Sequence, residues 1–481
     1  MKLSRIVAAI ACGLVVLTSC GPRVEEGPKG DGTGFKVTAS ASVIYANGSD
    51  AVVFTPLFDG LAIDSSTVTA YNAEDGNIVA LEGLTFVTEI TGSHKFYFTH
   101  TNAQGNHTSE TLEVIAIEKP RLDFGDIEQK GLTITPTTTI FQIGVEDAVL
   151  IVRRDGKVLD AVFDDEVTFF DATNNEPIPM TTKKMVDDNG TEMLMYCYAP
   201  KSACIRSIWA SCKTLNTKAK PIKMTAVEEP IPAPAIDVDA DNTSFERRSL
   251  LLQLTGTACP NCPRLMEVIE DLRENDKYAD KFVHVGVHTY NGSDPMYYKE
   301  SGFVSAIGGV DSYPAFVFDF RYSAAHSQQT FHDEIDEAQA SPAKAGIAAR
   351  IQTDGVTTAL ARVTVKAAEQ GEYCLGAMLV ESNIVAVQQG DQTGKFKVHE
   401  NALRKADGKN NGYYIGHSLG TLEAGETADY LFNLPLDSKW NVNNCHIVFY
   451  VTTPSGEKGS YEVTNAIASE SLNCTVQFDY K

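Results

Sequence analysis

Short stretches in which apolar and polar residues alternate, separated by turn residues, fill the first half of the chain. Residues 51–55 (AVVFT) lead to the turn Asp59-Gly60, and residues 67–71 (TVTAY) lead to Asp75-Gly76. An alternation with a period of two places one face of a strand on a core and the other face in solvent. The pattern predicts a small β-sandwich over residues 35–118.

The pattern of residues 35–118 recurs in residues 119–228. The triplet DAV at residue 50 is matched 97 residues later by DAV at residue 147, and VTAYNA at residue 68 is matched 99 residues later by VTFFDA. Similar patterns at a nearly constant offset indicate a divergent tandem repeat. Both copies resemble the immunoglobulin-like modules of bacterial surface proteins, and this resemblance implies two successive β-sandwich domains.

The periodicity changes after a proline-rich stretch at residues 229–244. Residues 249–255 form a nearly continuous apolar run, which is typical of a strand buried on both faces. Apolar residues then recur at helical spacing between 265 and 272, and residues 282–287 form a second apolar run. A turn and strand at 313–318 and a closing helix around Phe331, Ile335 and Ala338 follow. The order predicts a right-handed β-α-β unit continued by a helix, a strand and a helix.

Alternation with a period of two returns in the C-terminal part of the chain. It is clearest at residues 359–365, 376–380, 446–452 and 475–480. These runs predict another antiparallel β domain, most simply a sandwich. Between them, residues 390–416 form a long polar connection without clear periodicity, which we interpret as an ordinary loop in preference to a binding loop.

The N-terminus has the features of a secretory signal. Lys2 and Arg5 precede an apolar run from Ile6 to Leu17 that is too short to span a bilayer. The run ends in Leu17-Thr18-Ser19-Cys20, which resembles the lipobox of bacterial lipoproteins. That resemblance implies that Cys20 is lipidated and anchors the chain to a membrane. The acidic pair Glu25-Glu26 resembles the signal for surface export of lipoproteins in the Bacteroidetes.

Composition restricts the partners. With 40 basic and 63 acidic residues, the net charge is −23, so nucleic acid is not an expected partner. The 10 cysteines include Cys12 in the signal and Cys20 in the lipobox. Six others lie in two groups of three, which leaves one thiol over in each group, so we do not interpret them as a disulfide framework. Cys197 and Cys212 lie on strands that we expect to pair, and a cross-strand bond between them is an open alternative to two buried thiols.

The remaining pair, Cys259 and Cys262, carries the clearest chemistry. The apolar strand at 249–255 runs into Cys259-Pro260-Asn261-Cys262 at the start of the amphipathic helix. Pro260 suits the first helical position, where a missing N–H costs nothing. At a helix N-terminus the pKa of a cysteine can fall from about 8.5 into a range of about 3.5 to 7.5, which favours the reactive thiolate.

The stretch Thr255-Gly256-Thr257-Ala258-Cys259-Pro260-Asn261-Cys262-Pro263 resembles a motif of the thioredoxin superfamily. It is more similar to the motif of a family of Bacteroidetes outer-membrane lipoproteins that contain a thioredoxin-like domain. The resemblance implies that Cys259 is the attacking thiol and Cys262 the resolving thiol. It also implies that Pro314 is a cis proline and that the backbone of Tyr313 pairs with an extended substrate segment.

Three positions depart from that pattern. Gln253 stands six residues before Cys259, where many relatives have a buried acid that moves protons, and an amide cannot titrate. Ala258 replaces a common tryptophan, and Pro260-Asn261 replaces Gly-Pro. A metal site is not predicted, because no second Cys-x-x-Cys exists and the pair His284 and His288 lacks a third ligand. No cofactor is predicted.

These inferences together predict a multidomain protein. The expected fold class comprises two immunoglobulin-like β-sandwich domains, one α/β thioredoxin-like domain and one C-terminal antiparallel β-sandwich. The expected order is a signal peptide at 1–20, a flexible tether at 21–34, immunoglobulin-like domains at 35–118 and 119–228, a proline-rich linker at 229–244, the thioredoxin-like domain at 245–341, and the C-terminal sandwich at 342–481.

The leading functional hypothesis is an outer-membrane or surface-anchored lipoprotein that acts as a thiol-disulfide oxidoreductase. Reduced Cys259 would attack a disulfide of an envelope protein, and Cys262 would resolve the mixed disulfide. The expected partners are protein thiols or disulfides of the cell envelope and the membrane itself through Cys20. The alternative is a surface adhesion or ligand-binding lipoprotein in which the thioredoxin-like unit is a scaffold without catalysis.

Overall fold

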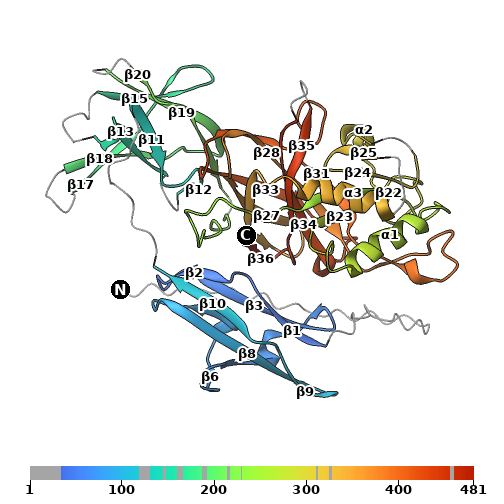
Figure 1. Ribbon diagram of the computed structural model, residues 1–481. Helices are drawn as coiled ribbons and strands as arrows, with labels where there is room; N and C mark the ends of the chain where they lie inside the picture. Colours follow the sequence, from blue (N-terminus) through green and yellow to red (C-terminus); the bar gives the residue numbers. More distant parts are fainter. Residues whose placement is uncertain are drawn as a thin grey trace, which may run out of the picture.

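The computed structural model describes ten stretches of the chain (Figure 1). They are residues 34–118, 130–144, 148–159, 166–186, 192–213, 217–228, 230–309, 312–323, 328–455 and 460–481. The predicted signal peptide, Cys20 and residues 21–33 of the predicted tether lie outside them. None of the helices in the described stretches has the length and hydrophobicity that crossing a bilayer requires.

The first unit consists of two β-sheets packed face to face. One sheet has the order β1-β3-β4 with β7 beside β3, and the other has the order β2-β10-β8-β5-β6 with β9 beside β8. Val37, Phe54 and Phe98 are among the buried residues between them. The strands are β1 (Phe35–Ala39), β2 (Val43–Tyr45), β3 (Ala51–Phe58), β4 (Leu61–Ala62), β5 (Val68–Asn72), β6 (Ile78–Val79), β7 (Thr85–Val87), β8 (Gly92–Asn102), β9 (Gly105–Thr108) and β10 (Leu112–Ile117).

The second unit repeats much of this arrangement, as the internal sequence match predicts. Its sheets have the orders β11-β13-β18-β17 and β12-β21-β19-β15-β16, and β12 pairs with β21 in parallel just as β2 pairs with β10. The strands are β11 (Leu132–Pro136), β12 (Ile140–Gln142), β13 (Ala148–Arg154), β14 (Lys157–Val158), β15 (Val167–Asp171), β16 (Pro177–Ile178), β17 (Thr181–Val186), β18 (Glu192–Tyr198), β19 (Cys204–Cys212), β20 (Thr217–Lys218) and β21 (Ile222–Val227). Cys197 lies on β18 and Cys212 on β19, so the expectation that their strands pair is wrong.

The rest of the chain forms a nine-stranded sheet and a four-stranded sheet, with a small hairpin beside them. The nine-stranded sheet has the order β25-β24-β22-β23-β31-β28-β34-β35 with β32 beside β28, and the four-stranded sheet has the order β33-β27-β26-β36. The strands are β22 (Ser249–Thr255), β23 (Phe282–His288), β24 (Ala315–Phe318), β25 (Arg321–Ser323), β26 (Ala345–Thr353), β27 (Thr358–Ala367), β28 (Gly371–Glu381), β29 (Ile384–Val385), β30 (Val398–His399), β31 (Ala402–Asp407), β32 (His417–Leu422), β33 (Thr427–Pro435), β34 (Cys445–Pro454), β35 (Tyr461–Ala468) and β36 (Cys474–Val476).

Three helices lie at one end of the nine-stranded sheet. They are α1 (Pro263–Glu274), α2 (Phe303–Ala306) and α3 (Gln328–Gln339). Leu265 and Ile269 of α1 and Phe331 of α3 share a buried cluster with Phe316 of β24. At the other end, the face of the sheet packs on the four-stranded sheet through a separate core. Figure 1 shows this arrangement, with the helices at one side of the molecule and the two packed sheets at its centre.

The expected fold class is wrong. The described residues are dominated by strands, and no independent α/β thioredoxin-like fold is present, because β22–β25 are only one end of the nine-stranded sheet. β23 pairs in parallel with β31 at Gly286 and Ala402, and one buried cluster contains both Leu252 and Tyr450. A strand inside a sheet needs a hydrogen-bonding neighbour at each edge, because its buried amides and carbonyls must be paired. Here one neighbour comes from more than a hundred residues further along the chain.

That neighbour corrects a second expectation. β31 lies inside residues 390–416, which we interpreted from the sequence as an ordinary polar loop. The strand is paired with β23 on one side and β28 on the other. The strand lacks a regular alternation of apolar and polar residues. Its charged residue Arg404 is nevertheless accommodated, because a carboxylate oxygen of Glu381 on β28 lies 2.7 Å from it. A charged residue with such a partner can lie in a strand without spoiling the packing.

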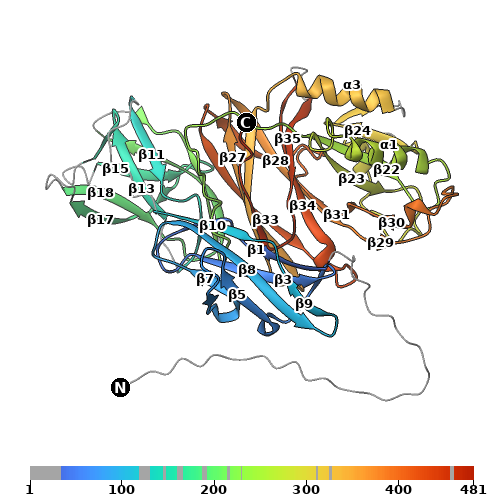
Figure 2. The same ribbon diagram turned by 60° about the horizontal axis from the view of Figure 1, so that its bottom comes forward.

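Both N-terminal units dock on the four-stranded sheet (Figure 2). A guanidinium nitrogen of the buried Arg350 on β26 lies 3.3 Å from a carboxylate oxygen of Asp50 in the first unit. Arg362 on β27 donates a hydrogen bond of 2.9 Å to the hydroxyl of Thr138 in the second unit. Buried cations are held by partners because an unpaired buried charge is costly. The two units are therefore fixed to the C-terminal sandwich by polar contacts.

Candidate functional site

The turn that carries the two cysteines is built by the strand and helix on either side of it. β22 ends at Thr255, the amide of Cys259 donates to the carbonyl of Gly256 at 3.0 Å, and α1 begins at Pro263. Pro263, and not Pro260 as the sequence suggested, therefore takes the first helical position, where a missing N–H leaves no donor unsatisfied. Cys262 is the residue that precedes the helix.

Cys259 and Cys262 form a disulfide, with their Cα atoms 5.5 Å apart. Only 1% of Cys259 and 0% of Cys262 is exposed, although Pro260 and Asn261 between them are exposed. In thiol-disulfide exchange, a thiolate attacks one sulfur of a disulfide in line with the S–S bond that breaks, so the reacting sulfurs must be accessible to each other. The structure therefore brings the two predicted cysteines together but gives neither of them open access to solvent.

A segment that overlaps the polar connection at residues 390–416, interpreted from the sequence as an ordinary loop, covers the backbone of this turn. It is the connection between β29 and β30, residues 386–397, which we call the cover segment. The amide of Gln389 donates to the carbonyl of Thr257 at 2.7 Å, and the side-chain amide of Gln388 donates to the carbonyls of Gly256 and Cys259 at 3.3 and 3.0 Å. Gln388 itself is only 3% exposed. The cover segment thus supplies hydrogen bonds to three carbonyls of the turn.

The close approach of the cover segment depends on Gly390. Its φ is +84°, and a Cβ at this position would lie 2.0 Å from the carbonyl oxygen of Pro260. Only glycine tolerates both conditions. Lys395 also forms an ion pair with Glu270 on α1. The cover segment is therefore attached to the turn and to the helix that follows it.

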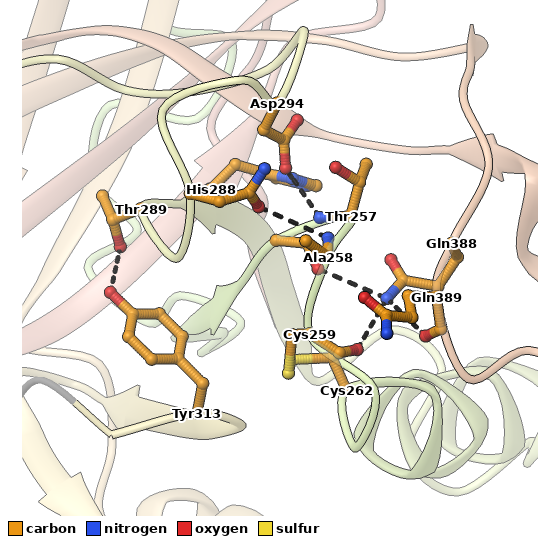
Figure 3. The surroundings of a disulfide bond; sticks show 12 residues. Thr257, Ala258, Cys259, Cys262, His288, Thr289, Asp294, Tyr313, Gln388 and Gln389 are labelled. Carbon is orange, nitrogen blue, oxygen red and sulfur yellow. Dashed lines mark hydrogen bonds and ion pairs between the residues drawn. A yellow bond between two sulfur atoms is a disulfide. The ribbon is translucent and has the colours of Figure 1, made fainter.

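Tyr313 and Pro314 lie on the other side of the disulfide. The peptide bond between them is cis, as the resemblance implied. The Tyr313 hydroxyl lies 2.8 Å from the hydroxyl of Thr289, and the Tyr290 ring meets the Tyr313 ring edge-on at 5.1 Å. Figure 3 shows the disulfide between Tyr313 and the pair Gln388 and Gln389. Tyr313 thus lies near the predicted pair Cys259 and Cys262, and Pro314 follows it in the chain, while the roles of these four residues in catalysis and substrate binding stay predictions.

Gln253, His284 and Arg273 form a hydrogen-bonded network in which His284 is held neutral and Arg273 carries the charge. Gln253 lies on β22, and its side-chain carbonyl lies 3.0 Å from Nε2 of His284, whose Nδ1 lies 2.9 Å from a guanidinium nitrogen of Arg273. A guanidinium can only donate, so Nδ1 accepts and Nε2–H donates to Gln253. Burial, followed by the charge of Arg273, holds the pKa of His284 well below its ordinary value. This network contains no carboxylate to exchange protons with a thiol.

Asp294 connects the turn to a second region. Its Oδ2 accepts hydrogen bonds from the amide of Thr257 at 2.7 Å and from Nδ1 of His288 at 2.9 Å, and its Oδ1 accepts from the amide of Met296 at 2.8 Å. Burial acts to raise the pKa of Asp294, but these hydrogen bonds and the nearby His288 outweigh it and lower the pKa to about 2. His288 and His284 are thus both buried and hydrogen-bonded, as expected of core histidines.

The second region is an open cavity of about 480 Å³ on the far side of Asp294, which we call the groove. Its walls come from three places: residues 292–300 after β23, residues 403–405 of β31, and the turn at residues 437–440. No motif marks it in the sequence, because its walls come from three separate segments, the first of which lies about a hundred residues before the other two. Within the described residues, no three His, Cys, Asp or Glu side chains gather closely enough to hold a metal ion, either there or at the disulfide.

The fold and site together define a β-rich protein of several units with one buried Cys-x-x-Cys disulfide. Neither a protein-family model nor a curated protein matches the chain. Among solved structures it is similar to HBP35 of Porphyromonas gingivalis, at a TM-score of 0.41 and 16% identity over 48% of this chain and 77% of that one.

Two further similarities are to an S-layer protein and to Intimin. The S-layer protein SbsC, domains 5–6, has a TM-score of 0.15 and 12% identity over 40% of this chain and 96% of that one. The D0-D1 domain of Intimin has a TM-score of 0.12 and 14% identity over 40% of this chain and 97% of that one. All three TM-scores are below 0.5, so these similarities define neither a shared fold nor a shared activity.

Proposed function

We propose that this chain is a surface adhesion or ligand-binding lipoprotein of the cell envelope and that its Cys259–Cys262 disulfide is a structural cross-link. The burial of both cysteines between Tyr313 and the cover segment carries this proposal. A disulfide that exchanges with protein substrates must be approached by another sulfur, and a disulfide that stabilises a turn need not be.

The network of Gln253, His284 and Arg273 supports the same conclusion. A thiol released by reduction needs a proton, and relatives with a buried acid near the second cysteine can supply one. Here Gln253 cannot titrate, and His284 is held neutral by burial and by the guanidinium beside it. This network therefore offers no titrating group to a thiol released at the turn, which supports a permanent disulfide.

The anchor and the location are part of the proposal. Leu17-Thr18-Ser19-Cys20 resembles a lipobox, so a lipid on Cys20 would hold the protein on the outer membrane. Residues 21–34 are rich in glycine, proline and charge and would hold the folded part away from the lipid surface. The acidic pair at Glu25-Glu26 favours export to the outer face. These features are consistent with the Bacteroidetes lipoprotein family that the Cys-x-x-Cys motif resembles.

The competing function is the thiol-disulfide oxidoreductase that the motif predicted, with envelope proteins as its partners. A Cys262→Ala variant tests it directly, because a catalytic Cys259 would then stay trapped in mixed disulfides with its substrates. We expect non-reducing gels of envelope extracts to show Cys259 without covalent adducts. The Cys259→Ala/Cys262→Ala variant provides the background. Reducible adducts in the single variant that are absent from the double variant would overturn the proposed function.

A further inference from the structure

The groove has a floor whose charges are already neutralised. Arg404 on β31 pairs with Glu381 at 2.7 Å and donates to the carbonyl of Pro295 at 3.0 Å. Its guanidinium carbon lies 6.0 Å from the centre of the Trp440 ring. Both charged side chains are almost fully buried. These contacts hold the Trp440 indole in place, and a fixed aromatic side chain can receive a ligand with little loss of conformational entropy.

The rim of the groove carries more unpaired cations than unpaired anions. Lys299, Lys405 and Lys439 line it, and none of them forms an ion pair with another described residue. Among the acidic residues of the lining, Glu300 pairs with Lys409, and Asp294 is buried and hydrogen-bonded to His288. Asp437 keeps its negative charge, because it accepts only from the amide of Lys439. In a chain with a net charge of −23, three lysines beside one exposed carboxylate give this cavity a local excess of positive charge that favours an anion.

The groove has the size of a ligand site and an aromatic wall. Its volume of about 480 Å³ is within the range of about 300–1,000 Å³ that is usual for such sites. Trp440 is one of only two tryptophans in the chain, and Tyr297 also belongs to the lining. An indole presents a flat apolar face, which matches the C–H face of a sugar ring.

The neighbouring strand argues against an extended peptide as the ligand. Peptides commonly bind by adding a strand to an open sheet edge. β28 pairs along one side of β31, and β23 pairs with the other side at Ala402. Beyond Ala402, the amide of Ala406 already donates to the Tyr298 hydroxyl at 3.2 Å, which leaves little free edge for an added strand. Recognition at the groove therefore depends on side chains, namely lysines and an aromatic ring.

We propose that the groove binds an acidic oligosaccharide, with a sugar ring on Trp440 and its carboxylates near Lys299, Lys405 and Lys439. This inference rests on the proposed function as a ligand-binding protein and adds the class of ligand. It does not depend on the state of the disulfide.

The test is calorimetric titration of the full mature chain, in detergent and at low salt, with trigalacturonate. We expect saturable binding that weakens as salt is added, because exposed charges are screened. The methyl ester of trigalacturonate keeps the sugar rings and removes the charge, so it should bind at least tenfold more weakly. Equal binding of the ester, or no binding of trigalacturonate, overturns the proposal.

Variants locate the binding in the groove. Trp440→Ala and the double variant Lys405→Gln/Lys439→Gln should each weaken binding at least tenfold, while Trp440→Phe retains most of it. Lys36→Gln, an exposed lysine on β1 of the first unit, should leave binding unchanged. Unaltered affinity in the groove variants overturns the proposal, as does equally tight binding of hexaglutamate, which would identify a site for acidic peptides. Trapped adducts on Cys259 would instead count against the proposed function, so the two failures are distinguishable.

Discussion

The disulfide turn and the groove lie on either side of Asp294 and differ in almost every respect. At the turn, Cys259 and Cys262 are buried, and Gln388 and Gln389 occupy the backbone carbonyls. At the groove, three lysines that form no ion pair with another described residue line an open cavity. The turn has the recognisable motif and the groove has none. The difference teaches that a reactive residue type indicates a site only when its surroundings leave it accessible.

Among the changes that should affect the disulfide turn and not the groove, we expect Gly390→Ala to have the largest effect on stability and on the rate of disulfide reduction. The new Cβ would meet the carbonyl oxygen of Pro260 at 2.0 Å in a left-handed backbone, so the cover segment must shift. We expect a loss of stability of about 3 kcal/mol, since strain at such positions costs about 1–3 kcal/mol and the clash adds to it. Reduction of the disulfide by dithiothreitol should accelerate at least tenfold.

Gly412→Ala is the matched control for that change. Gly412 has a similar φ of +88°, but a Cβ there would meet nothing within 4 Å. It should lose only about 1 kcal/mol from backbone strain, without faster reduction of the disulfide. Equal reduction rates in the two variants would show that the cover segment does not protect the sulfurs.

Asp294→Asn tests the connection between the two regions. The pKa of Asp294 is lowered to about 2, so its ionised form stabilises the folded state fully above about pH 4, and this stabilisation is lost as the pH falls through 2. We expect the variant to be less stable by about 2 kcal/mol at pH 7 in urea unfolding, with the difference shrinking toward pH 2. Asp276→Asn, at an exposed carboxylate, should change little. A difference that does not vary with pH would contradict this role.

Removal of both sulfurs should lower the free energy of unfolding by about the entropy that closing their loop removes from the unfolded chain. Cys259→Ala/Cys262→Ala opens a ring of four residues, for which the chain-entropy relation gives about 2 kcal/mol. The variant should stay folded and retain the groove, as checked by urea unfolding and trigalacturonate titration. Complete unfolding at neutral pH, or no loss of stability, would disprove the role of a modest cross-link.

The smallest effect is expected from Lys395→Gln. The ion pair of Lys395 with Glu270 is substantially exposed, and such pairs contribute about 0–1 kcal/mol. We expect no measurable change in the rate of disulfide reduction, with Lys397→Gln as the control. A large acceleration in Lys395→Gln alone would show that charge, more than the fit of Gly390, holds the cover segment.

Local patterns allowed some of this structure to be predicted. The apolar runs at 249–255 and 282–287 gave β22 and β23, and the internal match at an offset of 97 to 99 residues corresponds to strands in equivalent places of the two N-terminal units. The Cys-x-x-Cys turn was also expected, because strand, turn and helix signals follow one another in the sequence there. The cis bond before Pro314 was implied only by the resemblance to the thioredoxin superfamily, since no local pattern indicates it.

The features that decide function depend on distant partners. β31 looked like part of a polar loop because its partners, Gly286 on β23 and Glu381 on β28, lie elsewhere in the chain. The fit of Gly390 against Pro260 joins positions that are 130 residues apart. No local period carries such information, so neither the shared sheet nor the cover segment could be predicted. The expected separate α/β domain was wrong for that reason.

Reduction of the disulfide in the folded protein would show whether Cys259–Cys262 is a sealed structural cross-link. The intact protein would be incubated with dithiothreitol, pulsed with iodoacetamide at intervals, and digested to measure labelling of Cys259 and Cys262. The buried thiols Cys374, Cys445 and Cys474 serve as internal standards for global opening. We expect the rate of disulfide reduction to be no higher than the rate at which these standards become labelled. Reduction within seconds, while the standards stay protected, would contradict a sealed cross-link and restore the case for electron transfer.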